Sequence, residues 1–301
     1  MNTNREKQTV VVGGVPEHFN FPWLQAIEQG KFDSIGIDVT FQTMPGGTGQ
    51  MMKALDEKKL DVAIVLTEGG IAKILNGSPC RIVKTYVESS LIWGIHVAAD
   101  SSFASIDEIR GSTYAISRFG SGSHLMAIVD AAERGWESDV LQFHKVKNLQ
   151  GAREALRSGL ADTFFWERFT TAPMVDSGEF RRLDDRLTLW PAFVVCVRLE
   201  LLESQHQTIK KILEVVNQQC QHLMQDPEAC KSIAKRYQLK IDEVKKWFAL
   251  TKWNTNFAYQ KKEFQRAAKY LKKLELINPP NGEAIDVWID LNPDYQSSNA
   301  E

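Results

Sequence analysis

The sequence lacks several features that would place it in a functional class at once. No apolar run approaches the roughly 18 residues that a membrane span requires. A net charge of −2 over 301 residues gives no electrostatic reason to expect nucleic acid or an anionic membrane as a partner. The four cysteines show no CxxC or other metal-ligand spacing, so neither a disulfide framework nor a metal site is expected. These absences leave a globular chain of ordinary composition.

The common catalytic motifs are also missing. The chain has no GxxxxGK[ST] loop and no HExxH pair, and Gly120-Ser121-Gly122-Ser123 has the wrong spacing for a Gly-x-Ser-x-Gly elbow. We therefore predict no catalytic residue, no metal and no cofactor. The polar start of the chain does not resemble a signal peptide. This predicts a cytoplasmic protein with reduced thiols, and a periplasmic or secreted one only if a leader has been removed.

What the sequence does contain is an internal repeat. Residues 38–61 and 139–162 share identical residues at a constant offset of 101 positions: Asp38, Val39, Ala54, Leu55 and Asp61 recur as Asp139, Val140, Ala155, Leu156 and Asp162. In each copy a short apolar run, a break, a helix-like stretch and a second apolar run follow one another, which predicts a β–α–β unit used twice. Two similar α/β lobes usually bind something between them, so the repeat concerns function as well as fold.

The pattern along the chain predicts a two-lobed α/β fold, each lobe a mixed sheet flanked by helices. Lobe 1 is predicted over residues 8–92 and 195–275, lobe 2 over 93–194, and a C-terminal tail over 276–301. The tail carries one apolar patch, residues 287–289, and is expected either to pack on the surface or to be partly loose.

Two long apolar runs, residues 91–98 and 190–197, are predicted to cross between the lobes and form a two-strand hinge. Residues 181–185 are predicted as a loop before the second crossing. Trp93 and Trp190 lie on the crossings, where they either pack at the lobe junction or contact the cleft. The rest of the chain is predicted to be helical over residues 205–224, 227–237, 241–248 and 257–273.

Ligands in open α/β sheets bind outside the carboxyl ends of the strands. The loops predicted at those ends, which would line one shared cleft, are residues 13–18, 44–49, 67–70, 117–124, 144–148 and 166–169.

The glycine-rich and hydroxyl-rich loop 117–124 is the most informative of these loops. It leads into a predicted helix, whose free N–H groups attract small anionic groups. Gly120 allows a ligand to approach the backbone, Ser121 and Ser123 add hydroxyls, and Arg118 could add positive charge. The alternative is a plain turn in which a serine caps the helix.

Two loops of lobe 1 supply further candidates. Gly47 and Thr48 lie in the equivalent glycine-rich loop, where the alternative is a flexible turn with Thr48 as the helix cap. Thr67 and Glu68 place a hydroxyl and a carboxylate at a strand end, where Glu68 could instead cap its own helix or favour its dipole.

The remaining candidates pair an aromatic ring with carboxylates. Trp166 and Glu167 close the second repeat and suit stacking on a flat or cationic ligand, unless Trp166 is core and Glu167 faces solvent. Glu17 and His18 follow the first strand, where His18 could simply point to solvent from the first helical turn.

Several segments resemble one known family. Residues 10–16 (VVVGGVP), 46–48 (GGT), 59–64 (KLDVAI) and 105–116 (SIDEIRGSTYAI) resemble the type II periplasmic-binding-protein fold. The resemblance is strongest to the nitrate/sulfonate/taurine-type substrate-binding proteins of ABC transporters and to their relatives, the thiamine-pyrimidine precursor synthases. More narrowly, the leaderless chain resembles an intracellular group with this fold.

The resemblance implies that the lobes close on a small polar organic ligand, such as a sulfonate, a thiamine precursor or an amine. The alternative is an enzyme on the same scaffold that acts on a small heterocyclic metabolite. The cysteine-rich run of the precursor synthases has no counterpart here, so we expect binding rather than catalysis. A third hypothesis is a sensor whose C-terminal helices dock another protein; the sequence does not indicate which protein that would be.

Overall fold

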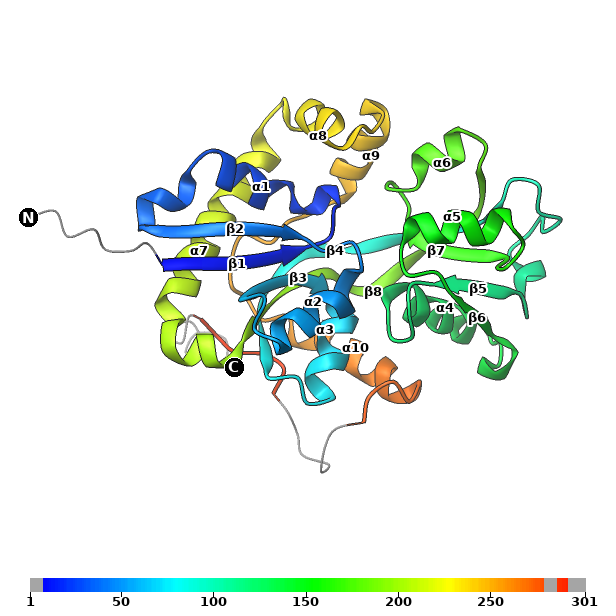
Figure 1. Ribbon diagram of the computed structural model, residues 1–301, viewed down its shortest axis with the longest axis horizontal. Coiled ribbons are helices and arrows are strands. Elements are labelled where there is room, and N and C mark those ends of the chain that lie inside the picture. Colours follow the sequence, from blue (N-terminus) through cyan, green and yellow to red (C-terminus); the bar gives the residue numbers. More distant parts are fainter. Residues whose placement is uncertain (1–7, 279–285, 292–301) are drawn as a thin grey trace, which may run out of the picture.

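The computed structural model describes residues 8–278 and 286–291. The strands of these residues form one sheet in the order β2-β1-β3-β8-β4-β7-β5-β6. Their bounds are β1 (Gln8–Gly14), β2 (Ile37–Thr43), β3 (Val62–Leu66), β4 (Cys80–Ala98), β5 (Thr113–Ile116), β6 (Gln142–Lys145), β7 (Thr163–Glu167) and β8 (Phe180–Arg198). Figure 1 shows two groups of elements, one around β1–β3 and one around β5–β7, with β4 and β8 running between them. The mixed α/β architecture predicted from the sequence is confirmed.

The strands β4 and β8 are 19 residues long each and pair antiparallel along most of their length. Their first and last parts lie in different lobes: β3 pairs with β8 from Val62 to Leu66, whereas β7 pairs with β4 from Trp93 to Val97. The register shifts several times between Ile82 and His96, as it does where bulges increase the twist of a ribbon. The lobe boundaries at 92/93 and 194/195 fall inside these continuous strands and stay a prediction.

The prediction of a loop over residues 181–185 was wrong, because these residues belong to β8. Arg181 pairs with Val97 and Asp184 with Ile95 in the ladder with β4. The polar side chains of this segment are accommodated in the strand because they form ion pairs, for example Arg168 with Asp185 at 2.9 Å. A charged strand of this kind does not show the apolar alternation by which strands are recognised.

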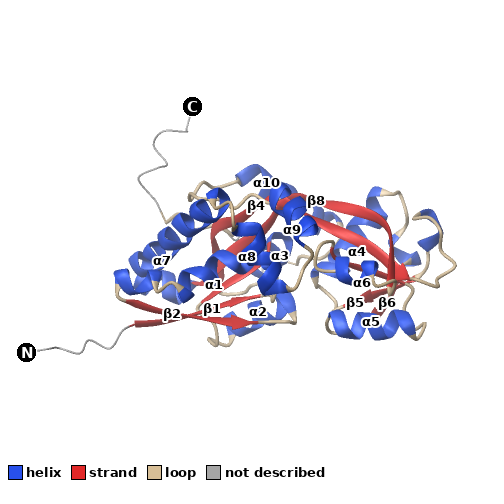
Figure 2. Ribbon diagram, turned by 90° about the horizontal axis from the view of Figure 1, so that it is seen from above, coloured by secondary structure: helices blue, strands red, loops and turns tan. Residues whose placement is uncertain are grey.

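Helices cover both faces of the sheet (Figure 2). In lobe 1 they are η1 (His18–Asn20), α1 (Phe21–Glu28), η2 (Lys31–Ile35), α2 (Gly47–Asp56) and α3 (Thr67–Leu75). In lobe 2 they are η3 (Asp107–Ile109), α4 (Gly122–Glu133), η4 (Ser138–Val140), α5 (Leu149–Arg157) and α6 (Ala172–Asp176). The C-terminal helices are α7 (Leu199–Gln225), α8 (Ala229–Tyr237), α9 (Ile241–Leu250) and α10 (Lys261–Lys273). Among these, α7 packs against α1, and α10 packs against α3 and β8.

The repeated aspartates Asp61 and Asp162 make equivalent hydrogen bonds in the two lobes. Asp61 accepts a hydrogen bond from the Val11 amide at 2.9 Å, and Asp162 accepts one from the Thr113 amide at 2.8 Å. Each carboxylate thus fixes the chain entering β3 or β7 to the first strand of its own lobe. The copies differ at their start, because Asp38 lies in β2 whereas Asp139 lies in the short helix η4.

One further segment differs from the sequence-based expectation, and the apolar patch of the tail follows one of its two alternatives. The last predicted helix, residues 257–273, begins at Lys261, since the Tyr259 ring instead stacks on Trp288 with centroids 4.7 Å apart. Trp288 is buried and the Ile82 amide donates to the Val287 carbonyl at 2.8 Å, so the apolar patch of the tail packs against β4. The other tail residues, 279–285 and 292–301, lie outside the described residues.

A buried lysine anchors the loop between α9 and α10. Lys84 in β4 is fully buried, and its ammonium donates to the Asn254 carbonyl at 2.9 Å, the Asn254 side-chain oxygen at 3.0 Å and the Asn256 carbonyl at 2.7 Å. Burial lowers the pKa of Lys84 to about 7. These contacts fix the loop to β4.

Candidate functional site

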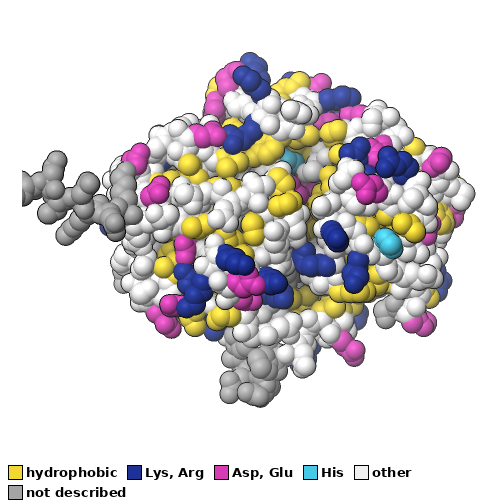
Figure 3. All heavy atoms as spheres, in the orientation of Figure 1, with side chains coloured by type: hydrophobic (Ala, Val, Ile, Leu, Met, Phe, Trp, Pro, Cys, Tyr) yellow, Lys and Arg dark blue, Asp and Glu magenta, His cyan; other side chains and the backbone are white. Residues whose placement is uncertain are grey.

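A cavity of about 350 Å³ lies between the lobes. Its wall combines apolar side chains with hydroxyl, amide and charged groups. Lobe 1 contributes Val15, Pro16, Glu17, Pro45, Gly46, Gly47, Thr48, Leu66, Leu91 and Phe193, and lobe 2 contributes Trp93, Ser117, Arg118, Ser121, Gly122, Ser123, Asn148, Leu149, Gln150, Trp166, Glu167 and Thr170. Figure 3 shows the hollow on this face, with Lys and Arg side chains on both sides of the boundary between the lobes.

The structure brings most of the candidate residues to this cavity. Glu17, Gly47, Thr48, Arg118, Ser121, Ser123, Trp166 and Glu167 line it, whereas His18, Thr67, Glu68 and Gly120 are not part of its wall. Most of the lining residues come from the segments that follow β1, β2, β5, β6 and β7, at the carboxyl ends of those strands, whereas Leu91, Trp93 and Phe193 belong to β4 and β8. The loop after β3 does not line the cavity. Only Leu66, the last residue of β3 itself, does so.

The turn between β5 and α4 holds its hydroxyls in a fixed pattern. Ser121 is the N-cap of α4, where its Oγ accepts from the His124 amide at 3.4 Å. Its Oγ lies 3.1 Å from the Ser123 Oγ, which accepts from the Ser117 amide at 3.1 Å. Ser121 therefore caps α4 and also lines the cavity. The two roles are compatible, because the N-cap residue lies at the helix end whose free N–H groups face the cavity.

The helices α2, α4 and α5 all begin at the cavity wall. Their first residues, Gly47, Gly122 and Leu149, line it. The α5 start is capped by Asn148, whose side-chain oxygen accepts from the Gly151 amide at 3.0 Å. Each helix start carries unpaired N–H groups and a partial positive charge, so their convergence makes the cavity attractive to a negatively charged group.

Two of these helix starts are further fixed by their neighbours. The Thr48 hydroxyl in α2 accepts from the Leu66 amide at 3.1 Å, which ties the helix start to the end of β3. A Cβ on Gly122 would lie 2.4 Å from the Leu66 Cδ1 and 2.8 Å from the Trp93 Cη2. Glycine at position 122 therefore lets the start of α4 in lobe 2 approach the end of β3 in lobe 1.

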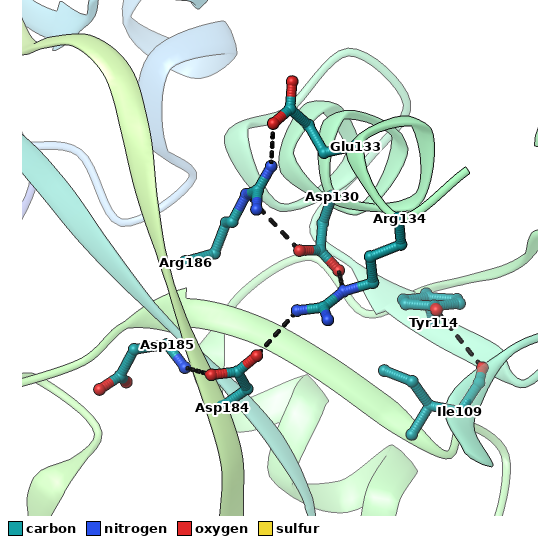
Figure 4. Close-up of polar contacts among 8 residues, drawn as sticks. All are labelled: Ile109, Tyr114, Asp130, Glu133, Arg134, Asp184, Asp185 and Arg186. Carbon is teal, nitrogen blue, oxygen red and sulfur yellow. Dashed lines mark hydrogen bonds and ion pairs between the residues drawn. The ribbon is translucent and has the colours of Figure 1, made fainter. Parts of the chain in front are cut away.

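The far end of α4 is held by ion pairs (Figure 4). Asp130, which is buried, accepts from the Arg134 Nε at 2.8 Å, and Arg134 reaches Asp184 in β8 at 2.8 Å. Arg186 in β8 bonds Glu133 at 2.9 Å. The helix that points its N-terminus at the cavity is thus fixed to β8 at its C-terminal end.

Arg118 crosses from lobe 2 to lobe 1. Its Nη1 donates to the Gly46 carbonyl in the loop before α2, whereas its Nη2 is buried and has no acceptor in the protein. Burial lowers the pKa of Arg118 from its usual value, yet guanidinium stays charged in proteins. Among the described residues no carboxylate pairs with it, so its charge is available to a ligand.

Two carboxyl groups border the cavity. Glu167 is buried, and it accepts from the Phe169 amide at 3.1 Å, the Thr170 amide at 2.7 Å and the Thr170 hydroxyl at 2.8 Å. Burial raises the pKa of Glu167 to about 7, against the lowering effect of these bonds. Burial and the Glu167 charge raise the pKa of Glu17 to about 8. Near neutral pH this pair therefore carries less negative charge than two free carboxylates.

Comparison with known proteins places this geometry in a known fold. Residues 93–186 match the family described as Ca3427-like PBP. The CA3427 gene product of Candida albicans, described as having the generic periplasmic binding protein fold, superposes with a TM-score of 0.79 at 25% identity, over 94% of this chain and 98% of that one. The chain has the fold of the type II periplasmic-binding-protein-like family.

Two solved binding proteins are similar to this chain in fold. The alkanesulfonate-binding protein SsuA of Xanthomonas axonopodis pv. citri, bound to MOPS, superposes with a TM-score of 0.74 at 16% identity, over 90% of this chain and 94% of that one. The nitrate-binding protein NrtA of Synechocystis PCC 6803 does so with a TM-score of 0.70 at 14% identity, over 92% and 84%. No curated protein matches the chain.

Three predicted site residues pack within this periplasmic-binding-protein fold instead of lining the cavity. His18 is buried, with its ring edge-on to Trp247 at 4.1 Å between centroids, and burial lowers its pKa to about 3. The alternative that it points to solvent was wrong as well, because α9 covers it. Glu68 is buried and accepts from the Trp190 indole at 2.7 Å, and Thr67 beside it is also buried. Burial raises the pKa of Glu68 to about 7.

The sequence did not single out several residues of the cavity wall. Asn148, which ends the predicted cleft loop 144–148, supplies a polar group, as do Gln150 and Thr170, and Leu91 and Phe193 supply apolar surface. Asn148 had a usable signal, since an asparagine directly before a helix-like stretch is a common N-cap. The others had none, because their place at the cavity depends on how β4, β8 and the loop after β7 approach one another.

The described residues give two further findings. In the described ranges no helix is long and apolar enough to cross a membrane. Nor do three or more His, Cys, Asp or Glu side chains gather there as a metal ion would require.

Proposed function

We propose that the chain binds a small organic molecule with an acidic group, such as a sulfonate, in the cavity between its lobes. The observation that carries this proposal is that three helix N-termini and Arg118 meet at one cavity. All of these groups offer N–H donors or positive charge, and a sulfonate or carboxylate supplies the matching acceptors.

The wall of the cavity supports an organic ligand rather than a bare inorganic ion. Trp93, Trp166, Leu91 and Phe193 give it large apolar surfaces, and a volume of about 350 Å³ is ordinary for small-molecule sites. An inorganic oxyanion would fill only the polar end and leave this surface without a partner.

The two carboxyl groups at the cavity are compatible with an acidic ligand, because their raised pKa values favour the protonated form. Protonated Glu17 and Glu167 can donate hydrogen bonds and do not repel an anion. We therefore favour the sulfonate over the amine-like ligand that the sequence left open. A thiamine-related ligand and a cytoplasmic location remain predictions from the sequence.

Ligand binding would also shift the lobes towards a closed arrangement. The lobes are connected through β4 and β8, and Arg118 already spans the cavity's edge. A ligand that contacts both lobes stabilises the closed form by its differential affinity for that form.

A titration-calorimetry panel tests the proposal. It contains MOPS, taurine and ethanesulfonate, an amine of similar size without an acidic group, and inorganic nitrate and sulfate. We expect an organic sulfonate to bind in the micromolar range, about −8 kcal/mol, and the amine to bind at least tenfold more weakly. Binding of the amine alone, or of no compound on the panel, would reject the proposal.

The enzyme alternative finds less support in the cavity. No lysine is among the cavity-lining residues that the structure describes, and the oxygens of Glu167 already accept bonds from residues 169 and 170. Turnover of a bound heterocyclic metabolite in the same assays, followed by mass spectrometry, would favour the enzyme.

A further inference from the structure

We propose that Arg118 is a latch that holds the lobes together and links that closure to the ligand's acidic group. The inference deepens the proposed function and rests on it for the ligand, whereas the latch itself can be tested without any ligand. The guanidinium contacts lobe 1 at Gly46 and Gly49, and Arg118 also lines the cavity in which the acidic group would lie.

The latch is a contact between two loops that follow parallel strands in different lobes. Arg118 lies after β5 in lobe 2, and its Nη1 donates to the Gly46 carbonyl in lobe 1. The two residues are 72 positions apart in the chain, so only the approach of the lobes brings them together. Opening the cleft must break this bond.

Glycine makes room for the guanidinium on the lobe 1 side. A Cβ at Gly49 would lie 2.1 Å from the Arg118 Nη2, 2.3 Å from its Nε and 2.4 Å from its Cζ. The planar group therefore lies directly on the backbone of the first turn of α2. Gly49 itself does not line the cavity, so its role can be separated from ligand contact.

The latch is incomplete within the protein alone. The Arg118 Nη2 is buried without an acceptor, and a buried donor left without a partner destabilises the arrangement that buries it. Arg118 also lines the cavity, beside the α4 start that would hold an oxyanion. Because Nη2 lies against the Gly49 backbone, an acidic ligand in the cavity would act on the charge of the guanidinium and offset the cost of burying it. The closed arrangement would then be more stable with ligand than without it.

The test uses two variants that disturb the latch in different ways. Arg118→Gln removes the charge and the fork of donors. Gly49→Ala leaves Arg118 intact but places a methyl group where the guanidinium lies; the flexible side chain can move away, and alanine is the better helix former, so the variant should fold. Arg118→Lys keeps the charge but lacks the planar fork. Arg157→Gln, an exposed arginine of α5, is the matched control.

The readout is the interlobe distance, measured by pulsed electron paramagnetic resonance between spin labels at Lys53→Cys in α2 and Ser158→Cys after α5. Cys230, which is partly exposed, is replaced by serine, whereas Cys80, Cys196 and Cys220 are buried. Without ligand, Arg118→Gln and Gly49→Ala should both shift the distances to longer values, Arg118→Lys should do so partly, and Arg157→Gln should match the parent protein. Unchanged distances in the first two variants would overturn the latch.

Calorimetry with MOPS on the same variants tests the link to the ligand. We expect affinity to fall about tenfold to a hundredfold in Arg118→Gln and about threefold to tenfold in Gly49→Ala. A Gly49→Ala protein that binds MOPS as tightly as the parent would show that Arg118 is a ligand contact only. If the parent protein does not bind MOPS or the other sulfonates, the proposed function is rejected, and so is the link between Arg118 and the ligand. The interlobe distances measured without ligand still test the latch itself.

Discussion

The raised pKa of Glu17 predicts a specific dependence of stability on pH. In the unfolded chain this carboxyl loses its proton near its ordinary pKa of 4.5, whereas in the folded protein it keeps the proton until about pH 8. Between these values the unfolded state alone ionises, so the free energy of unfolding falls as pH rises from about 4.5 to about 8. Above about pH 8 the carboxyl is ionised in both states, so the free energy of unfolding no longer falls because of Glu17.

The magnitude follows from the size of the shift. About 1.4 kcal/mol per pKa unit, applied to the interval from 4.5 to about 8, gives an upper value of about 5 kcal/mol. Glu17 is partly exposed to the cavity, and solvent screening reduces the effect. We therefore expect about 2 kcal/mol in practice.

Urea unfolding of the wild type and Glu17→Gln at about pH 5 and about pH 8.5 measures this effect. The variant cannot ionise, so it should match the wild type at the lower pH and exceed its free energy of unfolding by about 2 kcal/mol at the higher pH. Glu203→Gln, an exposed site in α7, is the control and should follow the wild type throughout. A difference between Glu17→Gln and the wild type that stays the same at both pH values would refute the electrostatic reasoning about the cavity.

Three further predictions concern packing and hydrogen bonding. Asp162→Ala leaves the Thr113 amide without its acceptor and should lower the free energy of unfolding in urea by about 1–3 kcal/mol; a loss below about 0.5 kcal/mol would contradict the role of the repeated aspartate. Gly122→Ala brings a Cβ within 2.4 Å of Leu66, so calorimetric affinity for the sulfonate should fall and Leu66→Ala should restore part of it; unchanged affinity would show that binding does not need this close approach. Lys84→Met removes the donor to both oxygens of buried Asn254 and to the Asn256 carbonyl and should cost about 2–4 kcal/mol in thermal or urea unfolding, whereas wild-type stability would show that the loop holds without the lysine.

The sequence was sufficient where local pattern and strand direction determine position. Loops at the carboxyl ends of parallel strands must meet at the same edge of a sheet, so strand direction alone assigns Thr48, Ser121 and Trp166 to one cavity. Their side chains line it. The repeated aspartates can be recognised in the same way, because each copy carries the same short-range pattern from helix to turn to strand.

Other assignments failed because they depended on which distant segment packs on a residue. His18 was assigned from its position after a strand, but α9, more than 220 residues later in the chain, covers its ring. Glu68 follows a strand end as predicted, yet its carboxyl accepts a hydrogen bond from Trp190 in β8. The polar first part of β8 was expected to be a loop, because nothing local in a charged segment shows that ion pairs will hold it in a sheet.

The sequence by itself determined the α/β class, the duplicated unit and the glycine-rich and hydroxyl-rich strand ends, since these follow from side-chain period and backbone propensity over short stretches. Only the tertiary structure decided that Arg118 lies on Gly46 and Gly49, that α2, α4 and α5 begin at one cavity, and that burial raises the pKa of Glu17 and Glu167. Desolvation and contacts between lobes arise from groups far apart in the chain, and no short-range pattern encodes them.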